Sequence, residues 1–326
     1  MNRSILSPIV LFTYNRPLHT QQLLNSLAKN TEAKDSIIYI YCDGAKENAS
    51  KEDILKINEV RSIISAENRF KKVFVKIQNK NNGLANSIIN GVTEIVNKHE
   101  KIIVLEDDLI LSPFFLSYMN DSLDRYKDNE KVGQIGSCNF FACGKNYPDY
   151  FFLAMSECLG WGTWKEKWNA FNPDGELLLN LINEKNLVER FNAYGSYDMV
   201  GMLQAQIDGR VSSWAIRWQA VCVLNNWLTL YPNPSYTQHK ESQEATHASV
   251  DIIPPLLNKK LKYYTKEVVE VDCVIEAMKL GYSGKSDYFG KLKWKFKKER
   301  IKKTIKIYFH PVIIKIFKSV KNSCKY

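Results

Sequence analysis

Three consecutive carboxylates, Glu106, Asp107 and Asp108, are the residues of this chain whose type and spacing point most directly to chemistry. They follow the apolar residues 102–105 and precede a Ser-Pro pair at 112–113, a typical start of a helix. Carboxylates this close repel by about 3–4 kcal/mol per pair in a protein environment, so we expect a cation to offset them. Hard oxygen ligands suit Mg²⁺ or Mn²⁺, and we expect such an ion as a cofactor that holds a phosphate-bearing ligand. The alternative is a solvated acidic loop.

The first half of the chain alternates apolar runs with amphipathic segments. Strands are expected at residues 8–13, 37–42, 73–77 and 101–105 and, in the second half, at 132–137. Helices are expected from residue 17, at 54–64, from 83 to 96 and at 113–126. This alternation predicts an α/β fold with a parallel, doubly wound sheet. The strand ends carry Asn15, Arg16, Asp43 and the three carboxylates, and sheets of this kind bind ligands at that rim.

The second half is less regular and is rich in aromatic residues. Gly160 and Gly162 flank Trp161, so we predict a loop that presents this ring to a sugar-binding cleft, with a place in the aromatic core as the alternative. A helix is expected at residues 196–207, with Asp198 in its first turn. The alternative to a functional role for Asp198 is that of a capping or helix-dipole partner.

Several classes of protein lack their sequence signals here. There is no G-x-G-x-x-G after the first strand, no Walker A loop and no G-x-S-x-G, which argues against dinucleotide, P-loop and serine-hydrolase sites. The seven cysteines include no C-x-x-C pair, so we expect neither a zinc site nor a disulfide framework, and we expect a reducing compartment. No apolar run reaches the roughly 18–20 residues that cross a bilayer.

Residues 285–326 form a strongly basic tail. They hold fourteen Lys or Arg against two acidic residues, so the net charge of +10 arises there. Lysines alternate with Trp, Phe and Ile, which predicts a basic amphipathic helical tail, broken at Pro311, that lies on an anionic membrane surface. The alternatives are a solvated tail and a nucleic-acid-binding tail. We expect no nucleic-acid partner, because no recognition module accompanies the charge.

Several segments together resemble the nucleotide-sugar-binding half of GT-A glycosyltransferases. They are PIVLFTYNRP at 8–17, CDG at 42–44, NNGLANSIINGV at 81–92 and VLEDDLILSPFFL at 104–116. The acidic motif followed by Ser-Pro-Phe-Phe is similar to the N-acetylglucosaminyltransferase I family. WGTW at 161–164 and SWAIRW at 213–218 resemble bacterial family 2-like sugar transferases.

This resemblance implies a domain organisation. A GT-A (Rossmann-like) domain with a mainly parallel sheet would cover residues 1–250. Its nucleotide-sugar-binding half would be 1–130 and its acceptor-binding half 131–250. A connecting segment at 251–284 would then lead to the membrane-associating tail at 285–326.

The resemblance also implies a role for each matched position. The nucleotide-sugar site would be formed by Thr13, Asn15, Arg16, Asp43, Asn82, Gly83, Glu106 and Asp107. The donor-sugar and acceptor pocket would be lined by Trp161, Trp164, Trp214 and Arg217. Asp43 would recognise the base, Asp108 would bind the metal directly, His247 would contact the metal or the diphosphate, and Asp198 would be the general base. The chain departs from these relatives at Ala215, where they often carry an acidic residue, and in the less apolar loop 234–244.

The function implied is that of a metal-dependent hexosyl- or N-acetylhexosaminyl-transferase. It would move a sugar from a nucleotide sugar, in the first place a UDP-sugar, to a glycan or lipid-linked glycan in surface polysaccharide or lipooligosaccharide synthesis. A metal cluster plus one separate carboxylate predicts inversion. The expected location is the cytoplasm, peripheral on the inner face of the cytoplasmic membrane. Two alternatives remain: a sugar nucleotidyltransferase, and a non-catalytic glycan- or nucleic-acid-binding protein.

Overall fold

The computed structural model describes residues 5–139, 144–239, 256–261, 264 and 267–283. The chain divides into two compact units, Met1–Lys279 and Leu280–Tyr326. The fold below is that of the first unit. The predicted tail at 285–326 lies outside the described residues, and the predicted domain boundaries remain predictions.

A mixed sheet forms the centre of the first unit. Within the described residues it has eight strands in the order β3-β2-β1-β4-β8-β6-β9-β7. Their bounds are β1 Ile9–Thr13, β2 Ile37–Cys42, β3 Lys72–Ile77, β4 Lys101–Glu106, β6 Val132–Gly136, β7 Tyr150–Leu153, β8 Trp161–Trp164 and β9 Leu228–Pro232. The pairs β1–β2, β2–β3, β1–β4 and β6–β9 are parallel, whereas β8 is antiparallel to β4 and β6, and β7 to β9. A short ribbon pairs β5 (Leu109–Leu111) with β10 (Thr237–His239) in antiparallel fashion.

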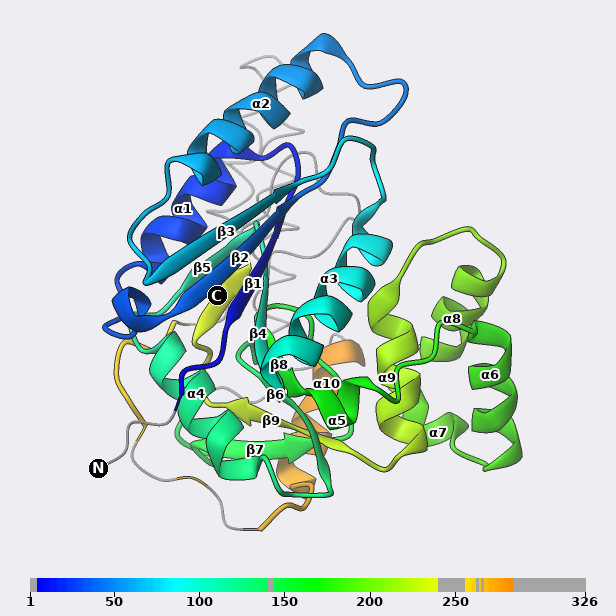
Figure 1. Ribbon diagram of the computed structural model, residues 1–326. Helices are drawn as coiled ribbons and strands as arrows, with labels where there is room; N and C mark the ends of the chain where they lie inside the picture. Colours follow the sequence, from blue (N-terminus) through cyan, green and yellow to red (C-terminus); the bar gives the residue numbers. More distant parts are fainter. Residues whose placement is uncertain (1–4, 140–143, 240–255, 262–263, 265–266, 284–326) are drawn as a thin grey trace, which may run out of the picture. The chain divides into compact units, whose positions relative to one another are not determined.

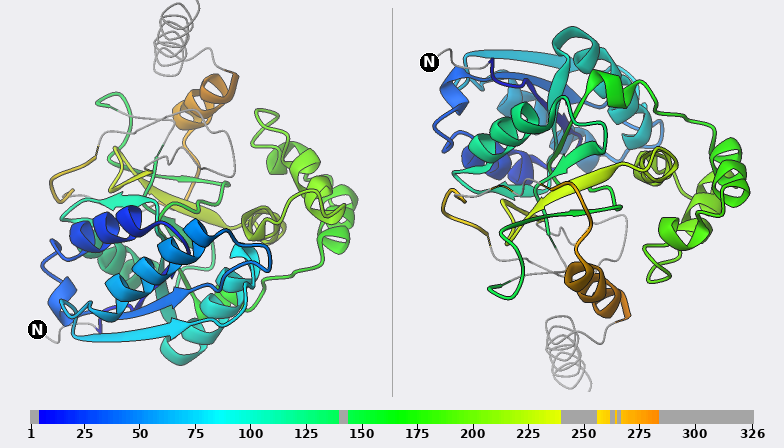
Figure 2. Two further views of the ribbon diagram at one scale, coloured as in Figure 1. Left: turned by 90° about the horizontal axis from the view of Figure 1, so that it is seen from above. Right: turned by 90° about the horizontal axis from the view of Figure 1, so that it is seen from below.

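Helices cover both faces of the sheet (Figure 1). One face packs against α1 (Pro17–Leu27), α2 (Lys51–Ser65) and α4 (Phe115–Tyr126). The other packs against α3 (Leu84–His99), α5 (Lys165–Trp168) and α9 (Trp214–Leu224). Helices α6 (Gly175–Glu184) and α8 (Met199–Ile207) pack on α9 and on each other. The short η1 (Ala33–Asp35) and α7 (Val188–Phe191) lie in connections, and α10 is Asp272–Ser283. Figure 2 shows α6 to α9 as one group of helices beside α3.

The predicted α/β class is confirmed, and the mostly parallel central sheet fits a GT-A-like fold. The first four strands lie within one residue of their predicted bounds. Helix α2 starts three residues earlier than expected because Ser50 caps it: the Ser50 hydroxyl oxygen accepts a hydrogen bond of 3.0 Å from the Asp53 N–H. Within the described residues, no helix is long and apolar enough to span a membrane.

The prediction that a loop presents Trp161 to a cleft is wrong. Residues 161–164 are β8, an inner strand between β4 and β6, and the Trp161 side chain is fully buried. Its ring stacks on Trp214 with centroids 5.0 Å apart, and both Trp164 and Trp214 are buried as well. These three rings therefore belong to the hydrophobic core and not to an open sugar pocket.

Close packing explains the two glycines that suggested a loop. A Cβ added at Gly162 would lie 2.8 Å from the carbonyl oxygen of Ile102 on the neighbouring strand and 3.0 Å from Met119 on α4. Gly160 has a φ of +92°, in the region that favours glycine. The glycines thus allow a tight strand approach and a turn into β8.

The core position of Trp161 predicts a large loss of stability on truncation. Trp161→Ala should lower the free energy of unfolding by about 3–5 kcal/mol, because it removes a buried aromatic side chain and leaves a cavity. Urea denaturation would measure it. The control Leu55→Ala, at a side chain that is 68% exposed, should change stability by no more than about 0.5 kcal/mol. Similar effects of the two substitutions would contradict the core assignment.

Candidate functional site

The acidic segment lies in a turn between two strands. Glu106 is the last residue of β4, Asp107 and Asp108 form the turn, and β5 begins at Leu109. The pairing of β5 with β10 sets His239 opposite Leu109. The two aspartates are therefore held between the end of an inner strand and a residue from far along the chain.

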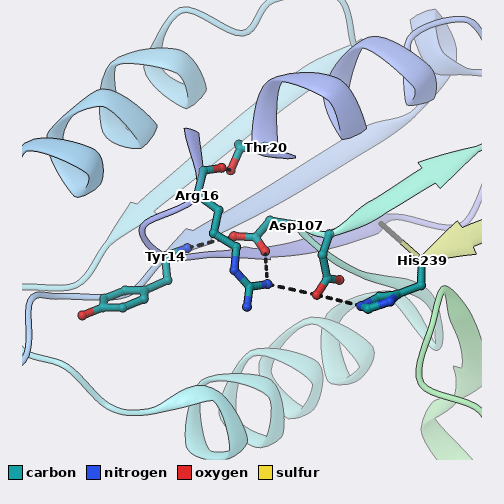
Figure 3. Close-up of polar contacts among 6 residues, drawn as sticks. Tyr14, Arg16, Thr20, Asp107 and His239 are labelled. Atoms are coloured by element: carbon teal, nitrogen blue, oxygen red, sulfur yellow. Dashed lines mark hydrogen bonds and ion pairs between the residues drawn. The ribbon is translucent and has the colours of Figure 1, made fainter. Parts of the chain in front are cut away.

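Arg16 is the cation that pairs with both aspartates (Figure 3). Its Nη1 atom lies 3.3 Å from Asp107 Oδ1 and 2.9 Å from Asp108 Oδ2. The backbone N–H of Tyr14 donates to Asp107 Oδ2 at 3.3 Å, and His239 Nε2 lies 3.3 Å from Asp108 Oδ2. The loop after β1 and the end of β10 thus converge on the same pair of carboxylates.

One guanidinium does not balance the charge of this segment. Burial raises the pKa of Glu106 well above its usual range, and the nearby Asp108 and Asp107 raise it further. Burial also raises the pKa of Asp107 to about 7, although Arg16 acts in the opposite direction. On Asp108 burial is outweighed by His239 and Arg16, which lower its pKa. The negative charge of the three carboxylates that Arg16 leaves uncompensated would favour the binding of a further cation.

A polar atom of Asp108 supports the same conclusion. Its Oδ1 oxygen is buried and has no hydrogen-bond partner among the residues that the structure describes. A buried carboxylate oxygen without a partner is costly unless a ligand or an ion satisfies it.

A cavity of about 1000 Å³ runs from Glu106 and Asp107 along the ends of β1 and β2 and beside α3; Asp108 and His239 are not among its lining residues. All eight residues predicted for the nucleotide-sugar site line it, namely Thr13, Asn15, Arg16, Asp43, Asn82, Gly83, Glu106 and Asp107. The structure therefore brings these residues together, while their roles in binding remain predictions.

Asp43 fixes the shape of the cavity at the end of β2. Its Oδ1 accepts hydrogen bonds from the backbone N–H groups of Gly44 and Asn82, both at 2.9 Å, and its Oδ2 accepts one from Gly83 at 3.0 Å. The side chain is buried. Asp43 thus holds the loop that leads into α3 against the strand end, a role that the sequence did not indicate.

Two other predicted residues are engaged in contacts within the protein. Thr13 donates its hydroxyl proton to the carbonyl oxygen of Tyr41 at 3.1 Å. The side-chain amide of Asn15 donates to Asp53 Oδ1 at 2.9 Å, and Asp53 also lines the cavity. These bonds tie the end of β1 to β2, and the loop after β1 to the first turn of α2.

The structure places three predicted site residues elsewhere or not at all. Asp198 is the exposed N-cap of α8, where its Oδ1 accepts a hydrogen bond of 2.8 Å from Gly201, the capping role that the sequence left open. Arg217 is buried in α9 and donates to the carbonyl oxygens of Ser213 and Pro173. Neither residue lines the cavity. His247 lies outside the described residues.

Sequence reasoning missed residues 210–212, which come from the loop between α8 and α9 and form part of the cavity wall. It also missed His239. Its position beside Asp108 depends on the pairing of β10 with β5, which no local pattern reveals.

Glu157 is a further carboxylate that the sequence did not single out. Its buried side chain accepts backbone hydrogen bonds from Ser137, at 3.2 Å, and from Leu159. Burial raises the pKa of Glu157 to about 8 against the effect of these bonds, and its charge raises the pKa of Glu106. Glu157 is thus electrostatically linked to the acidic segment.

Comparison with known proteins shows only distant likenesses. No protein-family model matches the chain, and no curated protein matches it. Solved structures of TarS from S. aureus are similar to it. Residues 1–349 of TarS in complex with UDP show 14% identity and a TM-score of 0.29 over 44% of this chain and 38% of that chain. A structure of TarS shows 12% identity and a TM-score of 0.38, over 73% of this chain and 37% of that chain. A structure of TarS 1–349 shows 9% identity and a TM-score of 0.36, over 69% of this chain and 60% of that chain. The chain therefore spans less than two thirds of the length of each of them.

The contacts of Asp43 predict a structural effect of its removal. Asp43→Ala should lower the free energy of unfolding by about 1–3 kcal/mol, because backbone N–H groups around a buried carboxylate lose their acceptor. Urea unfolding would detect it. Glu47→Ala removes an exposed carboxylate from the nearby loop and should be neutral within about 0.5 kcal/mol. Equal stability of the Asp43→Ala variant and the unmutated protein would show that these hydrogen bonds contribute little.

Proposed function

We propose that this chain is a metal-dependent glycosyltransferase whose donor is a nucleotide sugar. The observation that carries the proposal is a single cavity that joins polar groups at the ends of β1 and β2 to the carboxylates at the end of β4. A nucleotide sugar has the matching chemistry: a base and ribose that need hydrogen bonds, and a diphosphate that needs cations. The cavity, at about 1000 Å³, lies at the upper end of the usual range for small-molecule sites.

The residues at the acidic end fit a divalent cation such as Mn²⁺ or Mg²⁺. Asp108 offers a buried oxygen without a partner among the described residues, and His239 lies beside its other oxygen. Over the described ranges, no group of three or more His, Cys, Asp or Glu residues is placed to hold a metal ion. Mg²⁺ commonly takes one or two protein ligands together with substrate phosphates and waters. Asp108 and His239 would therefore hold the ion jointly with the donor diphosphate, and His247 remains a further candidate.

The bound ion would supply Lewis-acid stabilisation of the negative charge on the leaving diphosphate. The protein groups around it would bind and orient the donor. Arg16 lines the cavity next to the aspartates, and a guanidinium matches phosphate oxygens with two parallel hydrogen bonds. The loop that Asp43 holds would shape the end of the cavity that receives the base.

Transfer to an acceptor hydroxyl also needs a group that takes its proton, a contribution of typically 10²–10⁴-fold. Asp198 remains our proposed base on the strength of the sequence resemblance. A general base must contact the hydroxyl that attacks the donor sugar, so this role requires the N-terminus of α8 to lie beside the reacting carbon when both substrates are bound. Single displacement with inversion is the stereochemical course that we propose.

A UDP-sugar as donor and a glycan or lipid-linked glycan as acceptor are the substrate classes that we propose. Attachment to the inner face of the cytoplasmic membrane through the basic tail at residues 285–326 is the proposed location. Surface polysaccharide or lipooligosaccharide synthesis is the corresponding process.

The proposal predicts nucleotide- and metal-dependent stabilisation of the purified protein. Melting temperatures should be measured with UDP, GDP or CMP, each with and without Mn²⁺. Binding at 100 times the dissociation constant adds about 2.7 kcal/mol, which corresponds to a rise of several degrees for a protein of this size. We expect the rise for one nucleotide only, with UDP the first candidate, and only with Mn²⁺.

Asp108→Ala should abolish the metal-dependent part of the shift, whereas Asp128→Ala, at an exposed aspartate after α4, should leave it intact. A protein that none of the nucleotides stabilises would contradict the proposal. Hydrolysis of the nucleotide sugar in the presence of metal would then separate an enzyme from a glycan-binding protein, which leaves the donor unchanged.

A further inference from the structure

The Arg16 guanidinium lies between the two aspartates of the acidic segment. Its Nη1 atom contacts both Asp107 and Asp108, and the Asp108 oxygen that it contacts is the one that faces His239. The guanidinium therefore lies among the groups that would hold a divalent cation under the proposed function.

A guanidinium and a divalent cation that bind the same carboxylates lower each other's affinity for them. They repel each other, and in a site that is mostly buried this repulsion is only weakly screened. Asp108 keeps one oxygen, Oδ1, that Arg16 does not contact. A metal ion bound at Oδ1 would thus share the carboxylate with the Arg16 guanidinium on Oδ2, and the repulsion between the two cations would weaken the binding of each.

The structure also offers Arg16 a second place to bind. The residue stands at the N-cap of α1 and lines the cavity together with Thr13, Tyr14 and Asn15. Its side chain is 22% exposed, so it is not locked within the core. A diphosphate in this cavity would present the guanidinium with anionic oxygens, for which an arginine fork is well suited.

We propose that Arg16 and the divalent cation bind the aspartate pair in turn. In the donor-free protein Arg16 neutralises Asp107 and Asp108 and keeps the affinity for metal low. When the donor arrives, its diphosphate draws Arg16 away and the cation takes its place on Asp108. Metal and nucleotide therefore bind with positive coupling, and Arg16 transmits that coupling. The inference rests on the proposed function, since it assumes a metal and a diphosphate ligand.

The test is a titration of Mn²⁺, followed by electron paramagnetic resonance of the free ion, with and without saturating UDP. In the unmutated protein UDP should tighten Mn²⁺ binding by about 5- to 100-fold, the usual range of coupling between sites. In Arg16→Met, Mn²⁺ without UDP should already bind more tightly than in the unmutated protein, by a similar factor. UDP should then tighten Mn²⁺ binding less than it does in the unmutated protein, because only the contribution of its own phosphate ligands to the ion remains. Arg16→Lys, which keeps the positive charge, should resemble the unmutated protein.

A matched control separates local competition from a general change of charge. Arg210 also lines the cavity, but its guanidinium pairs with Asp208 at 2.8 Å and not with the acidic segment. Arg210→Met should leave the affinity for Mn²⁺ in the absence of UDP unchanged. Equal tightening in Arg210→Met and Arg16→Met would overturn the proposal, because it would show that any lost charge has this effect.

The remaining outcomes distinguish this inference from the proposed function. If the unmutated protein binds Mn²⁺ and UDP with coupling but Arg16→Met does not tighten Mn²⁺ binding, the inference fails and the proposed function stands. If no variant binds Mn²⁺ with or without UDP, the proposed metal dependence fails and the inference falls with it. Should Arg16→Met be poorly folded without ligand, Mn²⁺ alone should raise its melting temperature more than that of the unmutated protein; an equal or smaller rise would overturn the inference.

Discussion

Negative charge buried at the end of an inner strand is the constraint on which the rest of this structure depends. β4 lies between β1 and β8, so Glu106 and the two aspartates that follow emerge where little water can solvate them. Charge in such a place must be neutralised by groups brought to it. Arg16 and the Tyr14 N–H come from the loop after β1, and His239 comes from β10, so elements distant in sequence meet here.

The fold meets this constraint with a network of buried polar contacts around β5. The backbone N–H of Leu111 donates to the Ser26 hydroxyl oxygen of α1 at 3.1 Å, and the Asn30 side chain bonds the carbonyl oxygen of Ser112 and the N–H of Leu116. The Ser112 N–H in turn donates to the carbonyl oxygen of Tyr236, just before β10. A satisfied network of this kind rigidifies what it connects. α1, β5 and β10 are thus held in one arrangement around the aspartate pair.

The sequence allowed the first half of the fold, and the cluster of polar residues at its rim, to be predicted. Runs such as residues 37–42 are short, apolar and β-branched, and they form strands through local preferences that survive in the tertiary structure. Local sequence did not predict the place of Trp161, because a glycine beside a tryptophan is compatible with a turn and with a tight contact between strands. Only the tertiary neighbours of Gly162 decide between the two. His239 was beyond prediction for another reason: its place depends on pairing with a strand more than a hundred residues earlier.

Residues 210–212, in the cavity wall, have a consequence for how this chain can be altered. They come from the second half of the sequence, whereas most of the lining comes from the first. A chimaera could take its second half from another protein in order to gain a new acceptor preference. That exchange would also replace residues 210–212 and therefore one wall of the cavity. The two halves are therefore not modular parts, and a successful chimaera would have to retain the segment between α8 and α9 from this chain.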